Sequence, residues 1–259
     1  MPDGVASAYD SIAADYDTQV EGDAWMRDIL WRHFLAVFAP GNHILDVTCG
    51  TGLDAMFLAA RGMWVTALDI SPGMVQRLRA KAAWAGVSDR VQALVCDAGA
   101  PALWPSAHFD GIISTFAGLN TLTDLGAFAC AAAPLLRGGG HLIVHILSRC
   151  SAWECLGLAA RGRWQDARRL CRERDRPYTI GGQPVPHHLY LPREAYEGFF
   201  APYFGLQRTY SLGALRPPHT IRRVPPVVAQ ALGTLERPFA AHPPLLDYGR
   251  FFVLDMVRR

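Results

Sequence analysis

The sequence predicts an α/β fold whose doubly wound, mostly parallel sheet carries helices on both faces. Short apolar segments alternate with helix-like segments between residues 43 and 147, which is the pattern of βαβ units. The first segment, Ile44-Leu45-Asp46-Val47, runs into the turn Gly50-Thr51-Gly52, and the next one ends at Asp69. A strand, a glycine turn, a helix and a second strand ending in a carboxylate are typical of a nucleoside-binding unit.

Spacing and turn residues define the elements of the first half. Apolar residues at helical spacing predict a helix over 23–39. Pro72 favours the first turn of a helix, and Gly138-Gly139-Gly140 is expected to end another. We therefore predict strands at 43–48, 64–69, 91–96, 109–115 and 141–147, and helices at 53–61, 72–85 and 123–136.

The pattern changes after Leu147. Residues 151–175 are expected to form a helix with an arginine-rich face, and the Gly-Gly pair within 178–185 predicts a turn between two short strands. The remaining predicted elements are a helix from Pro192 through Phe200, a strand at 205–213, a helix near 225–236 and a strand at 251–257.

Composition narrows the class of protein. The 259 residues are enough for one elaborated domain, and no apolar run is long enough to cross a membrane. The N-terminus lacks the apolar segment of a secretion signal, and the six cysteines show no CxxC pair, so they are expected to be reduced thiols of a cytoplasmic protein. No zinc-type Cys/His spacing appears, and the net charge of +2 does not favour a nucleic-acid partner.

The glycine turn indicates which nucleoside is bound. Gly50 and Gly52 allow a ligand to approach the backbone, and Asp69 can accept hydrogen bonds from both ribose hydroxyls. The dinucleotide fingerprint needs a third glycine, which position 55 lacks. Asp46 adds a carboxylate that would repel a pyrophosphate but attract a sulfonium and an ammonium. The turn therefore favours a cationic nucleoside.

Four segments together resemble class I S-adenosylmethionine-dependent methyltransferases of the small-molecule type. Asp46–Gly52 resembles the first motif of that family, Ala67–Met74 its second strand and following helix, and Val95–Ala98 the end of its third strand. Tyr9–Asp17 is similar to the lead-in segment of many small-molecule members. The resemblance covers residues 9–147, and Cys49 departs from the small residue that the family usually carries.

The resemblance implies a seven-stranded Rossmann-like methyltransferase sheet that ends in an antiparallel pair, here 205–213 and 250–258. It also implies an organisation for the single domain 1–259. The expected parts are a helical lead-in over the cofactor (1–39), a cofactor-binding core (40–147), substrate-covering lid insertions (148–191 and 214–247), and a final helix and strand pair (192–213 and 248–259).

The same resemblance places S-adenosylmethionine at the turn, with no metal. Asp69 is expected at the ribose, Asp97 and Ala98 at the adenine, and the end of the fourth strand at the methionine. Tyr9 and Tyr16 lie seven residues apart, so on one helix they would share a face. That face is expected either to close over the cofactor or only to pack the helix on the domain. The expected cofactor-binding residues are Tyr9, Tyr16, Asp46, Thr48, Cys49, Gly50, Thr51, Gly52, Asp69, Ile70, Met74, Asp97, Ala98, Thr115, Phe116 and Ala117.

Histidines are the candidates for a general base. His145 lies near the carboxyl end of a strand, and adjacent His187 and His188 point to opposite faces, so at most one of that pair faces a pocket. Each is also compatible with a core or surface position. The expected substrate-binding residues are Asn120, Tyr178 and Tyr190, although Asn120 fits a turn equally well.

These features predict transfer of a methyl group from S-adenosylmethionine to an oxygen, nitrogen or carbon atom of a small organic molecule, with S-adenosylhomocysteine as product. The possible substrates include molecules of natural-product or specialised metabolism. The same fold also supports chemistry other than methyl transfer, or a non-catalytic partner subunit. A nicotinamide enzyme is disfavoured by the missing glycine. No nucleic-acid or membrane partner is expected, and the choice between monomer and homodimer stays open.

Overall fold

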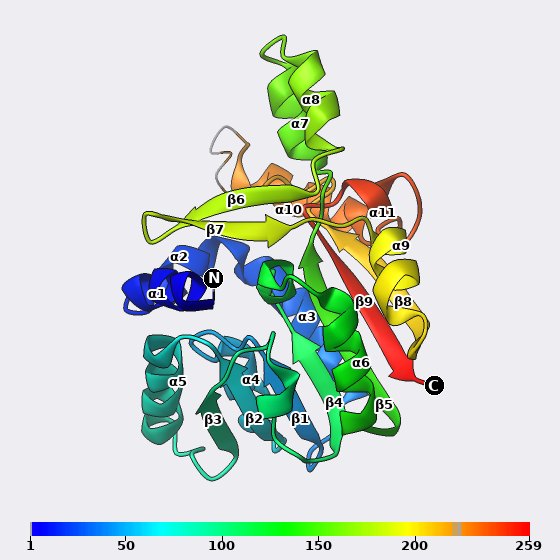
Figure 1. The fold of residues 1–259 in the computed structure, drawn as a ribbon. Coiled ribbons are helices and arrows are strands. Elements are labelled where there is room, and N and C mark those ends of the chain that lie inside the picture. Colours follow the sequence, from blue (N-terminus) through cyan, green and yellow to red (C-terminus); the bar gives the residue numbers. More distant parts are fainter. Residues whose placement is uncertain (1, 220, 222–223) are drawn as a thin grey trace.

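A seven-stranded sheet with strand order β3-β2-β1-β4-β5-β9-β8 forms the centre of the computed structural model, which describes residues 2–219, 221 and 224–259 (Figure 1). The strands β1 to β5 are parallel, and β9 lies antiparallel between β5 and β8. The strand bounds are β1 (His43–Val47), β2 (Trp64–Asp69), β3 (Val91–Val95), β4 (Phe109–Ser114), β5 (Leu136–Leu147), β8 (Phe204–Leu212) and β9 (Phe251–Arg258). This architecture confirms the predicted fold class and its antiparallel final pair.

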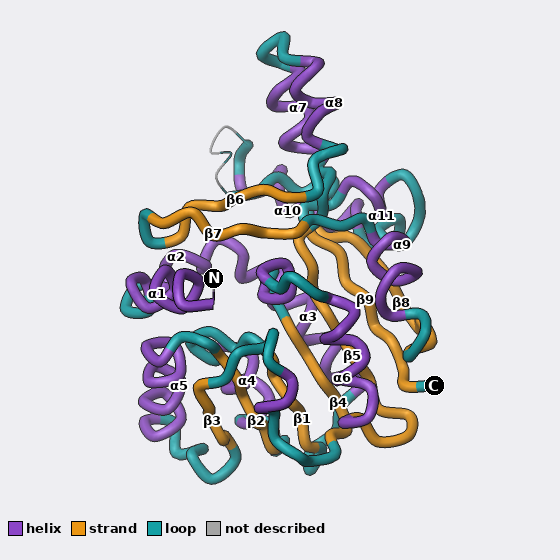
Figure 2. The backbone as a smooth tube through the Cα atoms, viewed as in Figure 1, coloured by secondary structure: helices purple, strands orange, loops and turns teal. Residues whose placement is uncertain are grey.

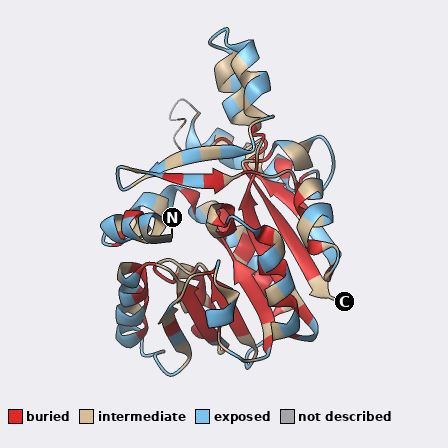
Figure 3. Cartoon of the chain, viewed as in Figure 1, coloured by how far each residue is buried: buried red, intermediate tan, exposed pale blue. Residues whose placement is uncertain are grey.

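Both faces of the sheet are covered. Ile44 faces a cluster that contains Phe34, and the next residue, Leu45, faces a second cluster that contains Phe128. This alternation explains why β1 is a continuous apolar run, and Figure 3 shows the central strands as largely buried. The covering helices are α3 (Ala24–Val37), α4 (Leu53–Ala59) and α5 (Pro72–Trp84) on the first face, and α6 (Leu125–Leu135) on the second.

The N-terminal segment differs from the expectation of one helical face. It forms α1 (Pro2–Ile12) and α2 (Tyr16–Val20), followed by a short turn of 3₁₀ helix (Glu21–Asp23). Residues 13–15 form a turn between α1 and α2, so Tyr9 and Tyr16 belong to different helices. Tertiary packing rather than helical periodicity therefore positions the two phenols.

Two further predictions were wrong, both at glycines. Gly138-Gly139-Gly140 does not end α6, because β5 begins directly after that helix at Leu136 and contains all three glycines. Gly139 has φ +79°, and the pairing of β4 with β5 shifts register between Phe109 and Gly111. The expected single helix over 151–175 is instead α7 (Ala152–Ala159) and α8 (Trp164–Leu170), separated at Gly162, whose φ is +75°. Figure 1 shows this helical hairpin projecting from the rest of the fold.

A second hairpin, β6 (Asp175–Ile180) and β7 (Gln183–His188), confirms the predicted Gly-Gly turn. Its tip lies against α1, and Figure 2 shows the two strands as an orange tube above the N-terminal helices. Gly181 has φ +55°, and a Cβ there would come 1.9 Å from Ser11 Oγ. The amide of Gln183 also lies 3.4 Å from Ser7 Oγ. The hairpin therefore depends on a glycine to approach α1 this closely.

The rest of the chain closes the far edge of the sheet. The predicted helix from Pro192 is α9 (Pro192–Ala195), which continues as a π-helical turn (Tyr196–Phe200). The last helices are α10 (Pro226–Glu236) and α11 (Leu245–Tyr248), and the short 3₁₀ turns Pro101–Leu103 and Gly118–Thr121 complete the described elements. None of the helices in the described part of the chain has the length and apolar character needed to traverse a bilayer.

Candidate active site

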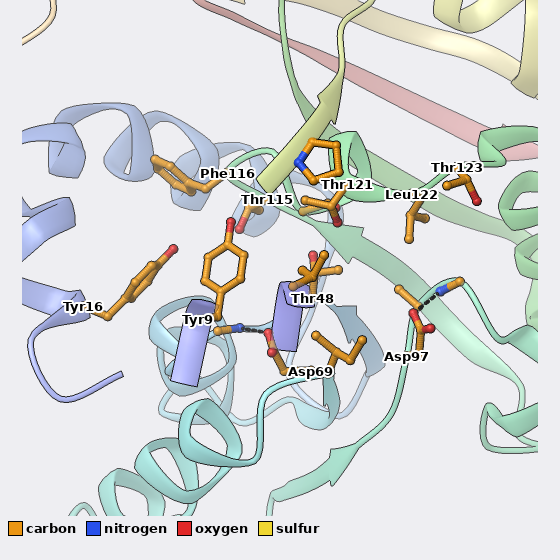
Figure 4. A pocket seen from close by; sticks show the side chains of 17 residues that line it. Tyr9, Tyr16, Thr48, Asp69, Asp97, Thr115, Phe116, Thr121, Leu122 and Thr123 are labelled. Atoms are coloured by element: carbon orange, nitrogen blue, oxygen red, sulfur yellow. Dashed lines mark hydrogen bonds between the residues drawn. The ribbon is translucent and has the colours of Figure 1, made fainter. Parts of the chain in front are cut away.

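A cavity of about 290 Å³ opens at the carboxyl ends of the parallel strands (Figure 4). Open α/β sheets bind ligands at this edge, and the volume is at the lower end for small-molecule pockets. The lining residues come from the ends of β1 to β4, from α1 and α2, and from β7. They are Val5, Tyr9, Tyr16, Thr48, Gly50, Asp69, Ile70, Asp97, Ala98, Gly99, Thr115, Phe116, Gly118, Thr121, Leu122, Thr123 and Pro186.

Asp69 is fixed by the glycine turn. Its Oδ2 accepts the Gly50 N–H at 2.8 Å and its Oδ1 accepts the Ser71 N–H at 2.9 Å. Each oxygen keeps lone pairs that can accept hydroxyl groups from a ligand in the cavity. Burial raises the pKa of Asp69 to about 6, although both backbone N–H groups oppose that rise. Asp69 therefore combines a fixed orientation with the acceptor capacity that a ribose needs.

Gly50 and Gly52 have different roles in this turn. Both have positive φ values, +55° and +80°. Gly50 lines the cavity, whereas a Cβ at Gly52 would lie 2.1 Å from the Leu78 side chain. Gly52 therefore serves the close packing of the turn against α5 rather than contact with a ligand.

Asp46 is the most unusual carboxylate in the structure. It is 1% exposed, and neither of its oxygens has a hydrogen-bond partner among the described residues. Burial, the largest cause, and the nearby Asp54 raise its pKa well above the usual range, and Arg27 only partly opposes this. A buried carboxylate without a partner is costly, which suits a site that is completed by a cationic ligand or its water. Asp46 does not line the cavity directly.

Asp97 lines the opposite part of the cavity. Its Oδ1 accepts the Gly99 N–H at 2.7 Å, which shapes the turn after β3. Ala98 and Gly99 lie beside it on the cavity wall. Figure 4 shows Asp69 and Asp97 on separate sides of the cavity, with the ring of Tyr9 near Asp69.

The two lead-in tyrosines both reach the cavity. Burial raises the pKa of Tyr9 well above its ordinary value and that of Tyr16 to about 12, so both phenols stay protonated near neutral pH. Asp10 anchors α1 by accepting hydrogen bonds from Ser71 Oγ and, at 2.8 Å, from Gly73 N–H. Asp17 holds the start of α2 through Lys81 and through the Thr51 hydroxyl.

A buried ion pair supports the wall at Thr115. Arg27 lies 2.7 Å from Asp54 Oδ1, and its guanidinium sits 4.1 Å from the centre of the Phe116 ring. Asp54 also accepts Trp31 Nε1–H at 2.7 Å and the Thr115 hydroxyl at 2.6 Å. This cluster was not predictable from the sequence, because its members are distant in the chain and no local motif marks them.

Backbone strain collects at the same wall. Thr48, Phe116 and Ala117 have φ values of +72°, +50° and +67°, which side-chain-bearing residues rarely adopt. Thr48 Oγ1 lies 2.8 Å from Ser114 Oγ, and a Cβ at Gly118 would meet this Thr48 oxygen at 1.9 Å. Strained residues of this kind cluster at ligand sites, and here they bring the ends of β1 and β4 together.

None of the three histidine candidates lines the cavity. His145 is 1% exposed, its Nδ1 accepts the Phe116 N–H at 3.2 Å, and burial lowers its pKa to about 3. His187 Nδ1 donates to the Val185 carbonyl at 3.0 Å, and its ring packs on Tyr178. His188 pairs with Asp175 at 2.5 Å. The expectation that His145 reaches the pocket is thus corrected, because Phe116 stands there instead.

The three expected substrate residues also lie outside the cavity lining. Asn120 is fully buried and uses its amide on the backbone, accepting the Leu147 N–H at 2.9 Å and donating to the carbonyls of Leu147 and His188. This is the structural alternative for Asn120, which joins β5 to β7. Tyr178 accepts a hydrogen bond from Arg176 at 3.1 Å, and Tyr190 packs on Phe199.

Some expected cofactor residues support the cavity without lining it, and several lining residues were missed. The supporting residues are Asp46, Cys49, Thr51, Gly52, Met74 and Ala117. The lining residues missed from the sequence are Val5, Gly99, Gly118, Thr121, Leu122, Thr123 and Pro186. Most of the missed residues follow β4, where the loop Thr121-Leu122-Thr123 had no motif to mark it.

Comparison with known proteins identifies a methyltransferase domain in this chain. Residues 44–140 match the family model of the methyltransferase domain. The chain is 31% identical over 146 residues to the demethylmenaquinone methyltransferase of Mycolicibacterium gilvum, covering 55% of this chain and 60% of that protein. The enzyme of the same name from Tropheryma whipplei is 31% identical over 147 residues, with 54% and 57% covered. The chain thus spans less than two thirds of these curated relatives.

Solved structures share the fold along the chain. The complex of DhpI with S-adenosylhomocysteine has a TM-score of 0.63 at 15% identity, covering 100% of this chain and 97% of that one. Geranyl diphosphate C-methyltransferase from Streptomyces coelicolor A3(2) has a TM-score of 0.55 at 12% identity, covering 90% and 77%. The [4+2]-cyclase SpnF has a TM-score of 0.59 at 19% identity, covering 89% and 80%. The family match therefore identifies a methyltransferase domain at residues 44–140, and the solved structures show that the fold of the whole chain is shared.

Proposed function

We propose that this protein transfers the methyl group of S-adenosylmethionine to a small, largely apolar organic molecule. The observation that carries the proposal is the cavity at the carboxyl ends of β1 to β4, with Asp69 held toward it by two backbone N–H groups. A methyltransferase domain with this carboxylate and the Gly50 turn in place would have the parts that we expect to hold the cofactor.

Residues of this chain are suited to contact the ribose, the adenine and the methionine end of the cofactor. Asp69 would accept the two ribose hydroxyls, and Asp97 with the Ala98 N–H would meet the adenine. The orphaned carboxylate of Asp46 suits the cationic methionine end, reached directly or through water. Bound S-adenosylmethionine supplies an activated methyl group, so the protein has to orient an acceptor and exclude water.

The part of the cavity that would hold the methyl acceptor suits a substrate whose reacting atom is nucleophilic without help from a protein base. Its wall combines apolar Val5, Leu122 and Pro186 with the hydroxyls of Thr121 and Thr123. Among the described lining residues there is no histidine, lysine or cysteine, and the high pKa values of both tyrosines keep their protons in place. A reacting atom that is nucleophilic near neutral pH, such as an enolate-like carbon or an ionised oxygen, needs no base from the protein.

The relatives named as demethylmenaquinone methyltransferases agree with an apolar organic acceptor, without identifying it for this chain. We further propose that α1 and the β6–β7 hairpin together form the cover over the site. Pro186 of β7 and Val5 of α1 both line the cavity, and Gly181 brings the hairpin tip against α1. This cover combines the N-terminal lead-in with part of the predicted insertion at 148–191.

Binding and transfer can be tested separately. Isothermal titration with S-adenosylmethionine and S-adenosylhomocysteine measures cofactor binding, and we expect one site per chain. Incubation with methyl-labelled S-adenosylmethionine and a panel of phenolic, quinol-type and isoprenoid acceptors should then yield labelled product and S-adenosylhomocysteine. If the purified chain binds neither nucleoside, the proposal is wrong and a non-catalytic subunit is favoured.

A second candidate function is chemistry other than methyl transfer on the same scaffold. The fold is shared with the [4+2]-cyclase SpnF, and the described cavity wall holds no histidine, lysine or cysteine, while its two carboxylates, Asp69 and Asp97, are assigned to the nucleoside in this proposal. The same experiment separates the two candidates. Cofactor binding with substrate conversion, but without transfer of label, would favour the second.

A further inference from the structure

Three cysteine sulfurs meet at the base of the helical hairpin α7–α8. Cys150 follows β5, Cys155 lies in the second turn of α7, and Cys171 follows α8. Cys150 and Cys171 form a disulfide, and Cys155 Sγ lies 3.9 Å from Cys150 Sγ and 3.4 Å from Cys171 Sγ. All three sulfurs lie within 4.8 Å of one another. The disulfide contradicts the expectation that all six cysteines are reduced thiols.

We propose that Cys150, Cys155 and Cys171, when reduced, form a three-thiolate binding site for a soft divalent cation such as Zn²⁺. Zn–S bonds of about 2.3 Å at tetrahedral angles place two sulfurs about 3.8 Å apart. The two distances from Cys155 are already close to that value. Only the Cys150–Cys171 pair has to separate once its bond is broken.

The chemistry of loading balances with a named reductant. A dithiol reduces the Cys150–Cys171 disulfide to two thiols and is itself oxidised to a cyclic disulfide. Zn²⁺ then replaces three thiol protons, which pass to solvent, and three Zn–S bonds form. The cation keeps a fourth position for water or an external ligand. No other redox partner is needed.

The surroundings suit a complex with one net negative charge. Arg176 lies beside the cluster, because its Nη2 donates to the carbonyl of Leu170, the residue before Cys171, at 3.4 Å. Its guanidinium is half-buried and is held by Glu154 at 3.1 Å and by Tyr178. Cys150 is 5% exposed, whereas Cys155 and Cys171 are half-buried, so the cluster has an inner wall and a side open to solvent.

The position links the cluster to the proposed cover. Cys171 is four residues before β6, and the Arg174 carbonyl accepts the Leu189 N–H at 2.6 Å just after β7. A cation at the three thiolates would therefore tie α7, α8 and the base of the β6–β7 hairpin to the end of β5. No motif marked this site, because Cys150, Cys155 and Cys171 have a spacing unlike that of common zinc sites.

The test uses the whole protein, reduced with a dithiol and then freed of that dithiol by gel filtration under anaerobic conditions. Titration with Zn²⁺ should give one ion per chain and protect three thiols from a thiol-reactive dye. Titration with Co²⁺ should give a thiolate-to-cobalt charge-transfer band. Cys155→Ser should weaken binding at least about 100-fold. Cys130→Ser, which removes an exposed cysteine outside the cluster, should leave binding unchanged.

The unreduced wild type is a control that needs no substitution, and its disulfide should prevent loading. A thermal melt of the reduced Cys155→Ser variant checks that it is folded, and reduced Cys171→Ser provides a second variant. The proposal is overturned if the reduced wild type takes up no Zn²⁺. It is equally overturned if Zn²⁺ binds as tightly to the Cys155→Ser and Cys171→Ser variants, or to the oxidised protein, because the ion would then lie elsewhere.

Discussion

Replacing Asp69 with alanine should remove the ribose anchor. An ionised carboxylate that accepts two ribose hydroxyls gains about 1.5–3 kcal/mol from each hydrogen bond. Their loss therefore costs about 3–6 kcal/mol, which weakens binding by a factor of at least about 100. The change also frees the N–H groups of Gly50 and Ser71, so the turn loses the side chain that fixes it. Both effects act in the same direction.

The raised pKa of Asp69 adds a pH dependence to the same prediction. Its pKa of about 6 means that the carboxylate is protonated as the pH falls below that value. Only the ionised form can accept both hydroxyls fully, so affinity should be constant above pH 7 and fall below pH 6. At pH 5 the expected loss is about tenfold relative to pH 7.5. Asp69→Asn should be weak at every pH and lack this slope.

The assay is isothermal titration with S-adenosylhomocysteine, which is not consumed, between pH 5 and pH 8. Asp89→Ala removes an exposed carboxylate outside the cavity and serves as the control. A wild-type affinity that does not change between pH 5 and pH 7.5 would refute the pKa argument. An Asp69→Ala variant that binds within about threefold of the wild type would refute the assignment of Asp69 to the ribose.

Three further predictions test the buried carboxylate, the histidine and the cover. Asp46→Asn should raise the melting temperature of the cofactor-free protein, and the rise should be larger at pH 8 than at pH 5. The reason is that the raised pKa of Asp46 in the folded state makes its ionisation increasingly costly as the pH rises. A lower melting temperature of the variant at both pH values would contradict this prediction. His145→Gln should leave the pH profile of turnover between pH 5 and pH 8 unchanged, because burial lowers the pKa of His145 to about 3. If the variant no longer shows a decrease in turnover toward low pH that the wild type shows, His145 would again be a candidate for the general base. Gly181→Ala should speed the dissociation of S-adenosylhomocysteine in stopped-flow measurements. Gly182→Ala should not, because Gly182 also has a positive φ but a Cβ there would meet no atom within 4 Å. Equal dissociation rates in the two variants would count against the proposed cover.

Local patterns predicted the parts of the fold that local physics determines. The strand β1, its glycine turn and Asp69 are contiguous or nearly so, and their residue types follow from backbone geometry and ligand contact. Ser71 caps α5 and Pro72 occupies its first turn, so the start of that helix was also predictable from the sequence. The Gly-Gly turn of the β6–β7 hairpin was predictable for the same reason.

Features that depend on distant residues were not predictable in this way. Arg27 and Asp54 pair across separate helices, and nothing in either segment signals the other. Gly139 forms part of an irregular strand, although three successive glycines usually end a helix. The contribution of Pro186 to the cavity required knowing that a hairpin from late in the chain lies over the N-terminal helices.

The lead-in helices α1 and α2 are held against the two turns at the carboxyl ends of β1 and β2. Asp10 holds α1 at the start of α5, next to Ser71, whose N–H binds Asp69. Asp17 holds α2 at Thr51, inside the glycine turn. The proposed cover is therefore attached to the same two turns that we propose to hold the nucleoside. A ligand that orders these turns strengthens the attachment of the cover, and release of the cover loosens the turns, so cofactor binding and closure should favour each other.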